Sequence, residues 1–263
     1  MAIKAIFLDI DGTLISFKTH TVPKSTLMAL AQLKQKNIKL FVATGRLPGD
    51  MDFLLKDLHE YFDAYVTLTG QYCFDKNHQV IHNQAIELSD LQNLDKILAT
   101  QEFACGFMEL DYYYLNLVNQ RILDLQKILG DTAPDRPIDS AKRILTHPTY
   151  QLNFFLDEPE VQKILQHMPN CRSVRWCPYF ADIIPKLGGK PEGIKHVLDH
   201  YGISPEETLA FGDGGNDKDM LEFAGIGIAM GNGTDEAKQA ADYVTDTVDD
   251  DGILNALKHF GIL

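Results

Sequence analysis

Short apolar runs alternate with longer segments of helical periodicity at both ends of the chain. Residues 3–8 are apolar apart from Lys4, which fits a strand buried on both faces of a sheet. Residues 23–37 follow with leucines spaced along one helix face. This alternation predicts a parallel α/β sheet with right-handed crossovers. The other strands expected at the two ends are 38–43, 64–68, 208–211 and 226–230, and the other helices are 52–59, 191–201, 216–223, 235–241 and 249–260.

The middle of the chain has a different texture. Residues 103–109 and 112–118 predict two strands of a hairpin, and residues 89–100 predict a helix with a serine cap. A hairpin does not belong to a simple parallel α/β frame, so this block reads as a separate, inserted unit. Its remaining expected elements are strands 150–155, 173–176 and 179–184, a helix at 160–167 and a proline-containing loop at 132–137.

The pattern therefore predicts two domains, and the length of 263 residues is sufficient for both. The first is an α/β, Rossmann-like parallel-sheet core formed by residues 1–81 and 184–263. The second is an inserted α+β domain formed by residues 82–183.

Charge and cysteine content narrow the function. A net charge of −13 disfavours binding to nucleic acid or to an anionic membrane surface. An anionic substrate would then need local cations or a metal ion to hold it.

The start of the chain lacks the basic region and cleavage site of a signal peptide, and no apolar run approaches the roughly 20 residues of a membrane helix. With four cysteines and no C-x-x-C pair, these features predict a cytoplasmic protein with reduced thiols.

The first of four polar clusters is Asp9-Ile10-Asp11-Gly12-Thr13, directly after a predicted strand. Open α/β sheets place their ligands at this edge. A carboxylate held at a strand end can attack phosphorus, and a second carboxyl group two residues on can serve as acid and base. Gly12 permits a sharp chain exit. Taken alone, the cluster fits a turn or helix cap equally well. An EF-hand is excluded because Gly12 is the fourth residue from Asp9 and not the sixth.

The second and third clusters supply groups that suit a phosphoryl oxygen. Thr44-Gly45-Arg46 offers a hydroxyl and adjacent backbone N–H groups, which form a small anion cradle. Lys190 precedes Pro191 at the start of a predicted helix, where a cation suits an anionic ligand. Each cluster alone also fits an ordinary turn or a solvated lysine, and Lys186 is an alternative cation.

The fourth cluster is Gly212-Asp213-Gly214-Gly215-Asn216-Asp217. Its glycines allow the backbone to come close to a ligand. Asp213 and Asp217 offer hard oxygen ligands that suit Mg²⁺ better than zinc. The G-x-G-x-x-G spacing of a Rossmann phosphate loop is absent. The alternative for this cluster alone is an acidic turn before a helix.

Taken in order, D-x-D-G-T, T-G-R, a lone lysine and G-D-x-x-N-D resemble the haloacid dehalogenase superfamily of phosphatases. The pattern is most similar to its Cof-type branch, whose cap domain is inserted between the second and third motifs. The stretches 229–233 and 251–253 also look like that branch. The resemblance covers the core, residues 1–81 and 184–263, and implies that residues 82–183 are the cap.

The resemblance also implies roles for the clustered residues. Asp9 corresponds to the nucleophile and to a Mg²⁺ ligand, and Asp11 to the acid and base, with its backbone carbonyl on the metal. The phosphate-binding positions are Thr44, Gly45, Lys190 and Asn216, the remaining metal carboxylate is Asp213, and the supporting residues are Gly12 and Asp217. One position departs from the pattern, because Thr69 precedes Gly70 where family members often have asparagine.

These roles predict a magnesium-dependent phosphatase that acts on small phosphorylated metabolites, such as sugar phosphates, through an aspartyl-phosphate intermediate. Asp11 favours phosphate esters, because dehalogenases of the family lack a carboxylate there. A phosphomutase with the same intermediate and a catalytically idle binding protein remain alternatives. We expect a monomer or homodimer. The side chains that could contact the leaving group from the cap, or merely pack there, are Tyr112, Tyr113, Tyr114, Arg143 and Trp176.

Overall fold

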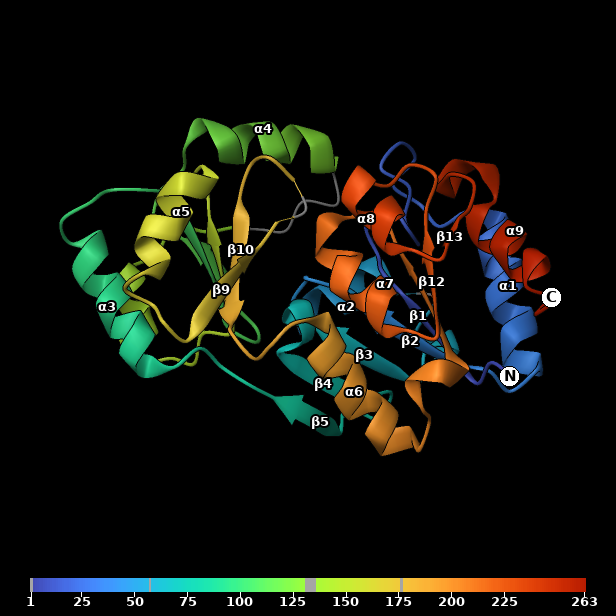
Figure 1. The fold of residues 1–263 in the computed structure, drawn as a ribbon. Helices are drawn as coiled ribbons and strands as arrows, with labels where there is room; N and C mark the ends of the chain where they lie inside the picture. Colours follow the sequence, from blue (N-terminus) through green and yellow to red (C-terminus); the bar gives the residue numbers. More distant parts are fainter. Residues whose placement is uncertain (1, 57, 131–135, 176) are drawn as a thin grey trace.

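The computed structural model describes residues 2–56, 58–130, 136–175 and 177–263, which form two sheets lying side by side (Figure 1). The larger, called here the core sheet, has eight strands in the order β13-β12-β11-β1-β2-β3-β4-β5. Its strands from β13 to β3 are parallel, and β4 and β5 are antiparallel. Their bounds are β1 Ala5–Leu8, β2 Lys39–Ala43, β3 Ala64–Thr67, β4 Tyr72–Asp75, β5 Val80–Asn83, β11 Thr208–Gly212, β12 Ile226–Ala229 and β13 Tyr243–Val244.

Helices cover both faces of the core sheet. Alternate residues of β1 explain this, since Ile6 and Leu8 point to one apolar cluster and Ala5 and Phe7 to another. The first face is covered by α1 Lys24–Gln35, α2 Pro48–Leu54 and α9 Gly252–His259, and the second by α6 Lys190–Tyr201, α7 Lys218–Phe223 and α8 Asp235–Ala240.

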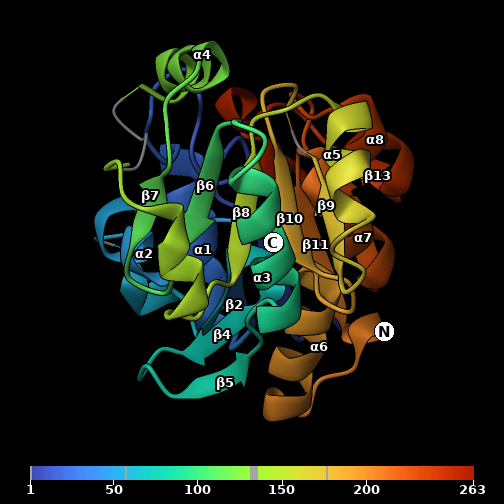
Figure 2. The same cartoon turned by 90° about the vertical axis from the view of Figure 1, so that its left-hand side faces the viewer.

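The smaller sheet, called here the cap sheet, has five antiparallel strands in the order β7-β6-β8-β10-β9. Its strands are β6 Cys105–Met108, β7 Tyr113–Leu115, β8 Gln151–Phe154, β9 Cys171–Val174 and β10 Ala181–Pro185. Figure 2 looks onto the cap, with α3 Leu88–Leu98 and α5 Glu158–Leu165 in front of this sheet. The other face carries α4 Gln120–Leu129 and shares an apolar cluster with Leu47 and Leu68 of the core.

Strand register brings the sequence clusters to one edge. In β1 and β11, Leu8 lies opposite Phe211, so the residues that follow both strands leave the sheet together. On its other side β1 pairs with β2, in which Val42 is the partner of Leu8. The chain segments that begin at Asp9, at Thr44 and at Asp213 therefore meet at the carboxyl edge of the core sheet.

The expected α/β fold, a Rossmann-like parallel-sheet core with an inserted α+β unit, is confirmed. The helix expected at 52–59 was wrong in position, because α2 begins at Pro48, in the first-turn position that proline favours, and ends at Leu54. Strands β4 and β5 and helix α4 were not expected from the pattern. The predicted domain boundaries stay predictions, and both fall inside strands, β5 and β10. Most of the expected loop at 132–137 and residue Trp176 lie outside the described residues.

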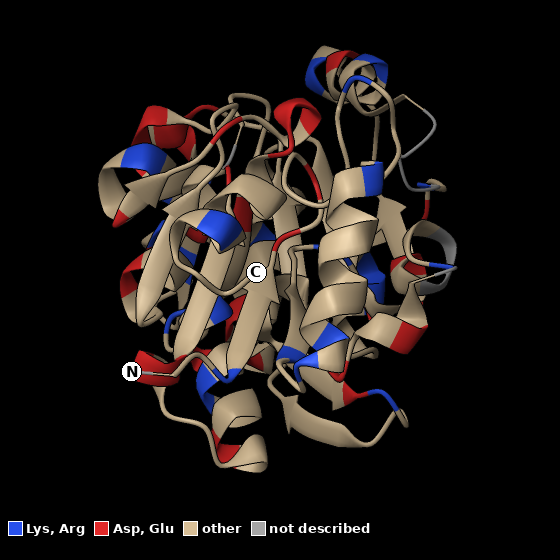
Figure 3. Ribbon diagram, turned by 90° about the vertical axis from the view of Figure 1, so that its right-hand side faces the viewer, with Lys and Arg blue, Asp and Glu red and all other residues tan. Residues whose placement is uncertain are grey.

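No helix of the described residues is both long enough and apolar enough to cross a bilayer. Acidic and basic positions are interspersed on the side of the molecule in Figure 3, within a chain that has 37 Asp+Glu and 24 Lys+Arg.

Close packing of α6 on the core sheet leads to the first prediction. A Cβ atom at Gly193 would lie 2.8 Å from both the Gly70 Cα and a methyl group of Val66. We expect Gly193→Ala to lower the free energy of unfolding by about 1–3 kcal/mol through overpacking, as measured by urea denaturation. The matched control is Lys195→Ala on the exposed side of the same helix, where the change should be within about 0.5 kcal/mol. Equal stabilities of the two variants would contradict this account.

Candidate active site

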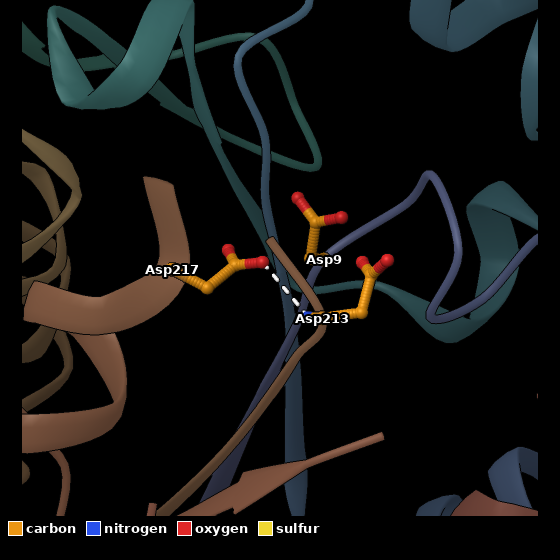
Figure 4. A group of neighbouring side chains, drawn as sticks. All are labelled: Asp9, Asp213 and Asp217. Carbon is orange, nitrogen blue, oxygen red and sulfur yellow. Dashed lines mark hydrogen bonds between the residues drawn. The ribbon is translucent and has the colours of Figure 1, made fainter. Parts of the chain in front are cut away.

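Three carboxylates converge at the carboxyl edge of the core sheet (Figure 4). Asp9 follows β1, Asp213 follows β11, and Asp217 ends the short 3₁₀ turn Gly215–Asp217. Each offers a carboxylate oxygen, and these oxygens lie within 4.8 Å of one another. All three residues are buried, yet Asp9 and Asp213 line a cavity of about 280 Å³. The two aspartates predicted to share a metal are thus close together, and both face a space that a substrate can enter.

Lys190 is the first residue of α6, and its fully buried ammonium group lies among these carboxylates. Its Nζ donates to Asp9 Oδ1 at 2.6 Å and also to Asp217 Oδ1. The other oxygen of Asp217 accepts hydrogen bonds from the backbone N–H groups of Asp213, at 3.0 Å, and Gly214, at 2.9 Å. Both oxygens of Asp217 are therefore occupied, which suits a residue that orients Lys190 and the loop. The alternative cation, Lys186, is exposed and does not line the cavity.

Burial and mutual repulsion together shift the pKa values of this cluster. Burial raises the pKa of Asp9 to about 7, and repulsion from Asp217 adds to the rise while Lys190 opposes it. Burial, followed by repulsion from Asp9 and Asp217, holds the pKa of Asp213 well above its usual value. Burial alone would lower the pKa of Lys190, but the two neighbouring carboxylates outweigh it and the pKa lies above its ordinary value. One ammonium group does not neutralise this set of acids.

A divalent cation would relieve that imbalance. Carboxylate oxygens are the ligands that hard cations prefer, and Asp9 and Asp213 are near enough to share one. Asp213 is held in place by the Thr13 hydroxyl, which donates to its Oδ1 at 3.3 Å. The residues present therefore fit a divalent metal ion.

Asp11, two residues after Asp9, forms a bidentate ion pair with Arg46. The guanidinium donates from Nε to Asp11 Oδ2 at 2.7 Å and from Nη2 to Oδ1 at 2.6 Å. Both residues line the cavity. Arg46 was part of the T-G-R motif but had no role assigned from the sequence. The sequence did contain a signal for this ion pair, because a basic residue follows one parallel strand and an acidic residue follows the neighbouring strand.

Gly12 is required by both conformation and space. Its φ is +85°, in the left-handed region that favours glycine, and an added Cβ would lie 2.2 Å from Asp213 Oδ2. The Gly12 carbonyl accepts a hydrogen bond at 2.8 Å from Asn232 Nδ2, a contact that the sequence did not suggest. The turn after Asp9 is thus fastened to the loop after β12.

The remaining predicted site residues line the same cavity: Thr44, Gly45 and Asn216. The Thr44 Oγ1 accepts a hydrogen bond from the Arg46 N–H at 3.2 Å, so it lies inside the turn that the T-G-R motif forms. All the residues expected at the site are brought together here. Of the aromatic cap candidates within the described residues, Tyr113 lines the cavity and Tyr112 and Tyr114 do not. Arg143 pairs instead with Glu109, at 2.8 Å.

Known proteins are similar to this chain in both fold and sequence. The sequence profile of the haloacid dehalogenase-like hydrolases matches residues 6–257. The solved structure of the HAD subclass IIB sugar phosphatase BT4131 superposes with a TM-score of 0.90 at 39% identity, covering 99% of this chain and 100% of that one. The phosphatase BT1666 from Bacteroides thetaiotaomicron gives a TM-score of 0.90 at 33% identity, covering 100% of this chain and 96% of the other.

A relative from Bacillus subtilis (strain 168), named "Putative phosphatase YkrA", is 33% identical over 99% of this chain and 98% of its own length. An α/β core with buried carboxylates at its carboxyl edge and a second unit inserted beside the cavity fits the fold of these phosphatases. The chain belongs to the haloacid dehalogenase-like hydrolase family. The family expected from the motifs, and with it the prediction of a hydrolase, is confirmed.

The crowded carboxylates lead to the second prediction, on metal binding and pH. Because the folded-state pKa of Asp9 is raised from about 3.8 to about 7, its contribution to the stability of the metal-free protein is present at low pH and is lost as the pH rises through this window. Protons and a cation compete for the same oxygens. We expect Mg²⁺, at about 100 times its dissociation constant at pH 8, to raise Tm by roughly 5 °C at pH 8, and the same Mg²⁺ concentration to raise Tm by less at pH 6.

Two aspartate substitutions make this test specific. Asp213→Asn should lose most of the magnesium-induced rise in Tm measured by differential scanning calorimetry. Asp235→Asn, the same change at an exposed position on α8, should retain it. A full rise in Tm in Asp213→Asn would show that the cation binds elsewhere.

Proposed function

We propose that this protein is a Mg²⁺-dependent phosphatase that hydrolyses phosphate monoesters of small metabolites through a phosphorylated Asp9. The observation that carries the proposal is the position of the Asp9 carboxylate, which lines the cavity while bound to Lys190 and beside Asp213. A carboxylate with this arrangement is a fixed nucleophile with a cation ready for the phosphoryl group. A binding protein would not require it.

Each residue of the site has a task in this proposal. Asp9 attacks phosphorus, and the phosphoryl–oxygen bond to the leaving group breaks while Asp11 gives that oxygen a proton. Asp11 then removes a proton from the water that attacks the aspartyl phosphate. Lys190 and the Thr44 hydroxyl bind the phosphoryl oxygens, with Gly45 and Asn216 at the same cavity. Asp11 must exchange one bond to Arg46 for a bond to the leaving oxygen.

The metal would be held by the carboxylates of Asp9 and Asp213 and the backbone carbonyl of Asp11, with Asp217 as the supporting residue. When bound, Mg²⁺ supplies positive charge that lets the anionic substrate approach an anionic nucleophile and stabilises the developing charge. This is how a chain with a net charge of −13 can hold a phosphorylated substrate.

The cap, residues 82–183 in the proposed division, contributes the wall of the cavity that faces the leaving group. Sugar phosphates are the favoured substrates, in keeping with the similarity to a sugar phosphatase. The four cysteines are free thiols, which suits the proposed cytoplasmic location.

The third prediction concerns the nucleophile. Asp9→Asn should fold, because it removes repulsion from a buried carboxylate, yet should lose turnover by a factor on the order of 10⁶, the size seen when other enzymes lose a nucleophile. Inorganic phosphate released from p-nitrophenyl phosphate with Mg²⁺ present measures the rate, and circular dichroism checks the fold. Substantial residual turnover in the folded variant would remove Asp9 from this role. Release without a bisphosphate activator separates hydrolysis from a phosphomutase reaction.

The fourth prediction separates the two tasks of Asp11. A nitrophenolate group leaves without a proton, so Asp11→Asn should still form the phosphorylated enzyme from p-nitrophenyl phosphate. Hydrolysis of the phosphorylated enzyme should slow by about 10²- to 10⁴-fold, because the attacking water has lost its base. Rapid mixing should then show a burst of nitrophenol close to one equivalent per active site, followed by slow turnover. Asp9→Asn, as the matched control, should give no burst. A slow first turnover in Asp11→Asn would contradict the assignment.

A further inference from the structure

A buried acid on the cap faces the catalytic carboxylates across the cavity. Asp182 belongs to β10, and only 2% of its surface is exposed, yet it lines the same cavity as Asp9. Its Oδ1 accepts hydrogen bonds from Gln151 Nε2 at 2.9 Å and from Asn153 Nδ2 at 2.6 Å. Both donors lie on the adjacent strand β8, where Asn153 is the direct partner of Asp182.

The two amide groups are fixed in these orientations by further partners. The Thr69 hydroxyl, from the core loop after β3, donates to Gln151 Oε1 at 2.8 Å. The Tyr113 hydroxyl donates to Asn153 Oδ1 at 2.5 Å. Because each amide oxygen already accepts a hydrogen bond, each amide NH₂ is directed to Asp182. The network therefore places Asp182 rigidly and occupies one of its two oxygens.

The second oxygen of Asp182 has no such partner. Among the residues that the structure describes, none donates a hydrogen bond to Oδ2. This atom faces the phosphate-binding loop, since a Cβ built on Gly45 would lie 3.9 Å from it. Burial raises the pKa of Asp182 to about 7, against the effect of the hydrogen bond from Asn153 and the charge of Lys190. Asp182 lines the cavity, so this oxygen is open to a hydrogen-bond donor brought by the substrate.

We propose that Asp182 accepts a hydrogen bond from a hydroxyl group of the substrate's leaving group, and so selects phosphate monoesters of sugars and polyols. The proposal rests on the proposed function, because it places the phosphoryl group at Asp9 and the leaving group toward the cap. A hydroxyl donates to the open carboxylate oxygen without adding charge. A second carboxylate or phosphate at this position would be repelled by Asp182.

Other groups of the cavity agree with a neutral, hydroxylated leaving group. Asp50 adds a further carboxylate at the cavity, and burial raises its pKa, with Arg46 opposing the rise. The Arg136 guanidinium lies 5.2 Å from the Tyr113 ring centroid and also lines the cavity. Each hydroxyl group of a polyol can donate and accept a hydrogen bond, so a polyol can donate to the carboxylates and accept from the guanidinium in one pocket. An anionic group can accept from the guanidinium but has no proton to donate to the carboxylates.

The fifth prediction tests this role with Asp182→Asn, which keeps the size and removes the charge. For sugar and polyol monophosphates, kcat/KM should fall about 10- to 100-fold, mainly through KM, because a charge-assisted hydrogen bond is lost. For p-nitrophenyl phosphate, which has no hydroxyl group to offer, kcat/KM should change less than about threefold. The matched control is Asp90→Asn, the same change at an equally buried cap carboxylate that does not line the cavity. It should leave both substrates unaffected.

Deoxy analogues identify the hydroxyl group. If Asp182 binds it, the analogue that lacks this group should be a poorer substrate for the wild-type enzyme, and Asp182→Asn should cause little further loss with it. Equal losses on sugar phosphates and the aryl phosphate would mean that Asp182 acts only on cap structure, and would overturn the proposal. So would a wild-type enzyme that prefers the aryl phosphate over every sugar phosphate. A wild-type enzyme that cleaved neither class would overturn the proposed function itself, and this proposal with it.

Discussion

The crowding of carboxylates around one buried ammonium group is the constraint on which this structure depends. Lys190 binds Asp9 and Asp217 inside a site where Asp213 also lies close by, so the acids outnumber the cations. Removing charges from water is expensive, and such an arrangement is stable only when each charge is paired or bonded. Asp217 meets this condition through Lys190 and two backbone N–H groups. Asp9 shares the Lys190 ammonium group with Asp217, and Asp213 is held by the neutral Thr13 hydroxyl, so burial and then the neighbouring carboxylates raise the pKa of both. A divalent cation shared by Asp9 and Asp213 would offset this excess of negative charge.

The convergence of these residues could be predicted because it follows from sheet geometry alone. Parallel strands send their carboxyl ends to the same edge, so clusters after β1, β2 and β11 had to meet once those strands were recognised as neighbours. The place of Lys190 followed from a proline-marked helix start, and the structure resolves the competition with Lys186, because the side chain that is first in α6 is the one buried at the site. Local signals left both lysines open, and it was the resemblance of the ordered motifs to the haloacid dehalogenase superfamily that favoured Lys190.

The cap side of the site could not be predicted in this way. Asp182, Gln151 and Asn153 lie in ordinary strand patterns, and nothing in their neighbours marks them as a network. They meet through antiparallel pairing of β8 with β10, and Gln151 gains its last partner from Thr69, 82 positions away. Period-2 alternation predicts which residues share a face of a strand but not which cavity that face will border. The strands β4 and β5 were missed because each has only four residues, and β5 contains no fully buried residue, so neither carries a clear apolar pattern.

The position of Thr69 connects the two halves of the site. Its φ of 55° places a β-branched residue in the left-handed region, which is unfavourable and where asparagine is more common. The backbone holds it there, because the Thr69 N–H donates to the Thr44 carbonyl at 3.0 Å. The side chain then reaches the cap through Gln151. The loop that begins at Thr44 and the cap network are thus joined through Thr69, and such strain persists only where the surroundings enforce it. The Thr69 hydroxyl thus orients the amide of Gln151, and through it the carboxylate of Asp182.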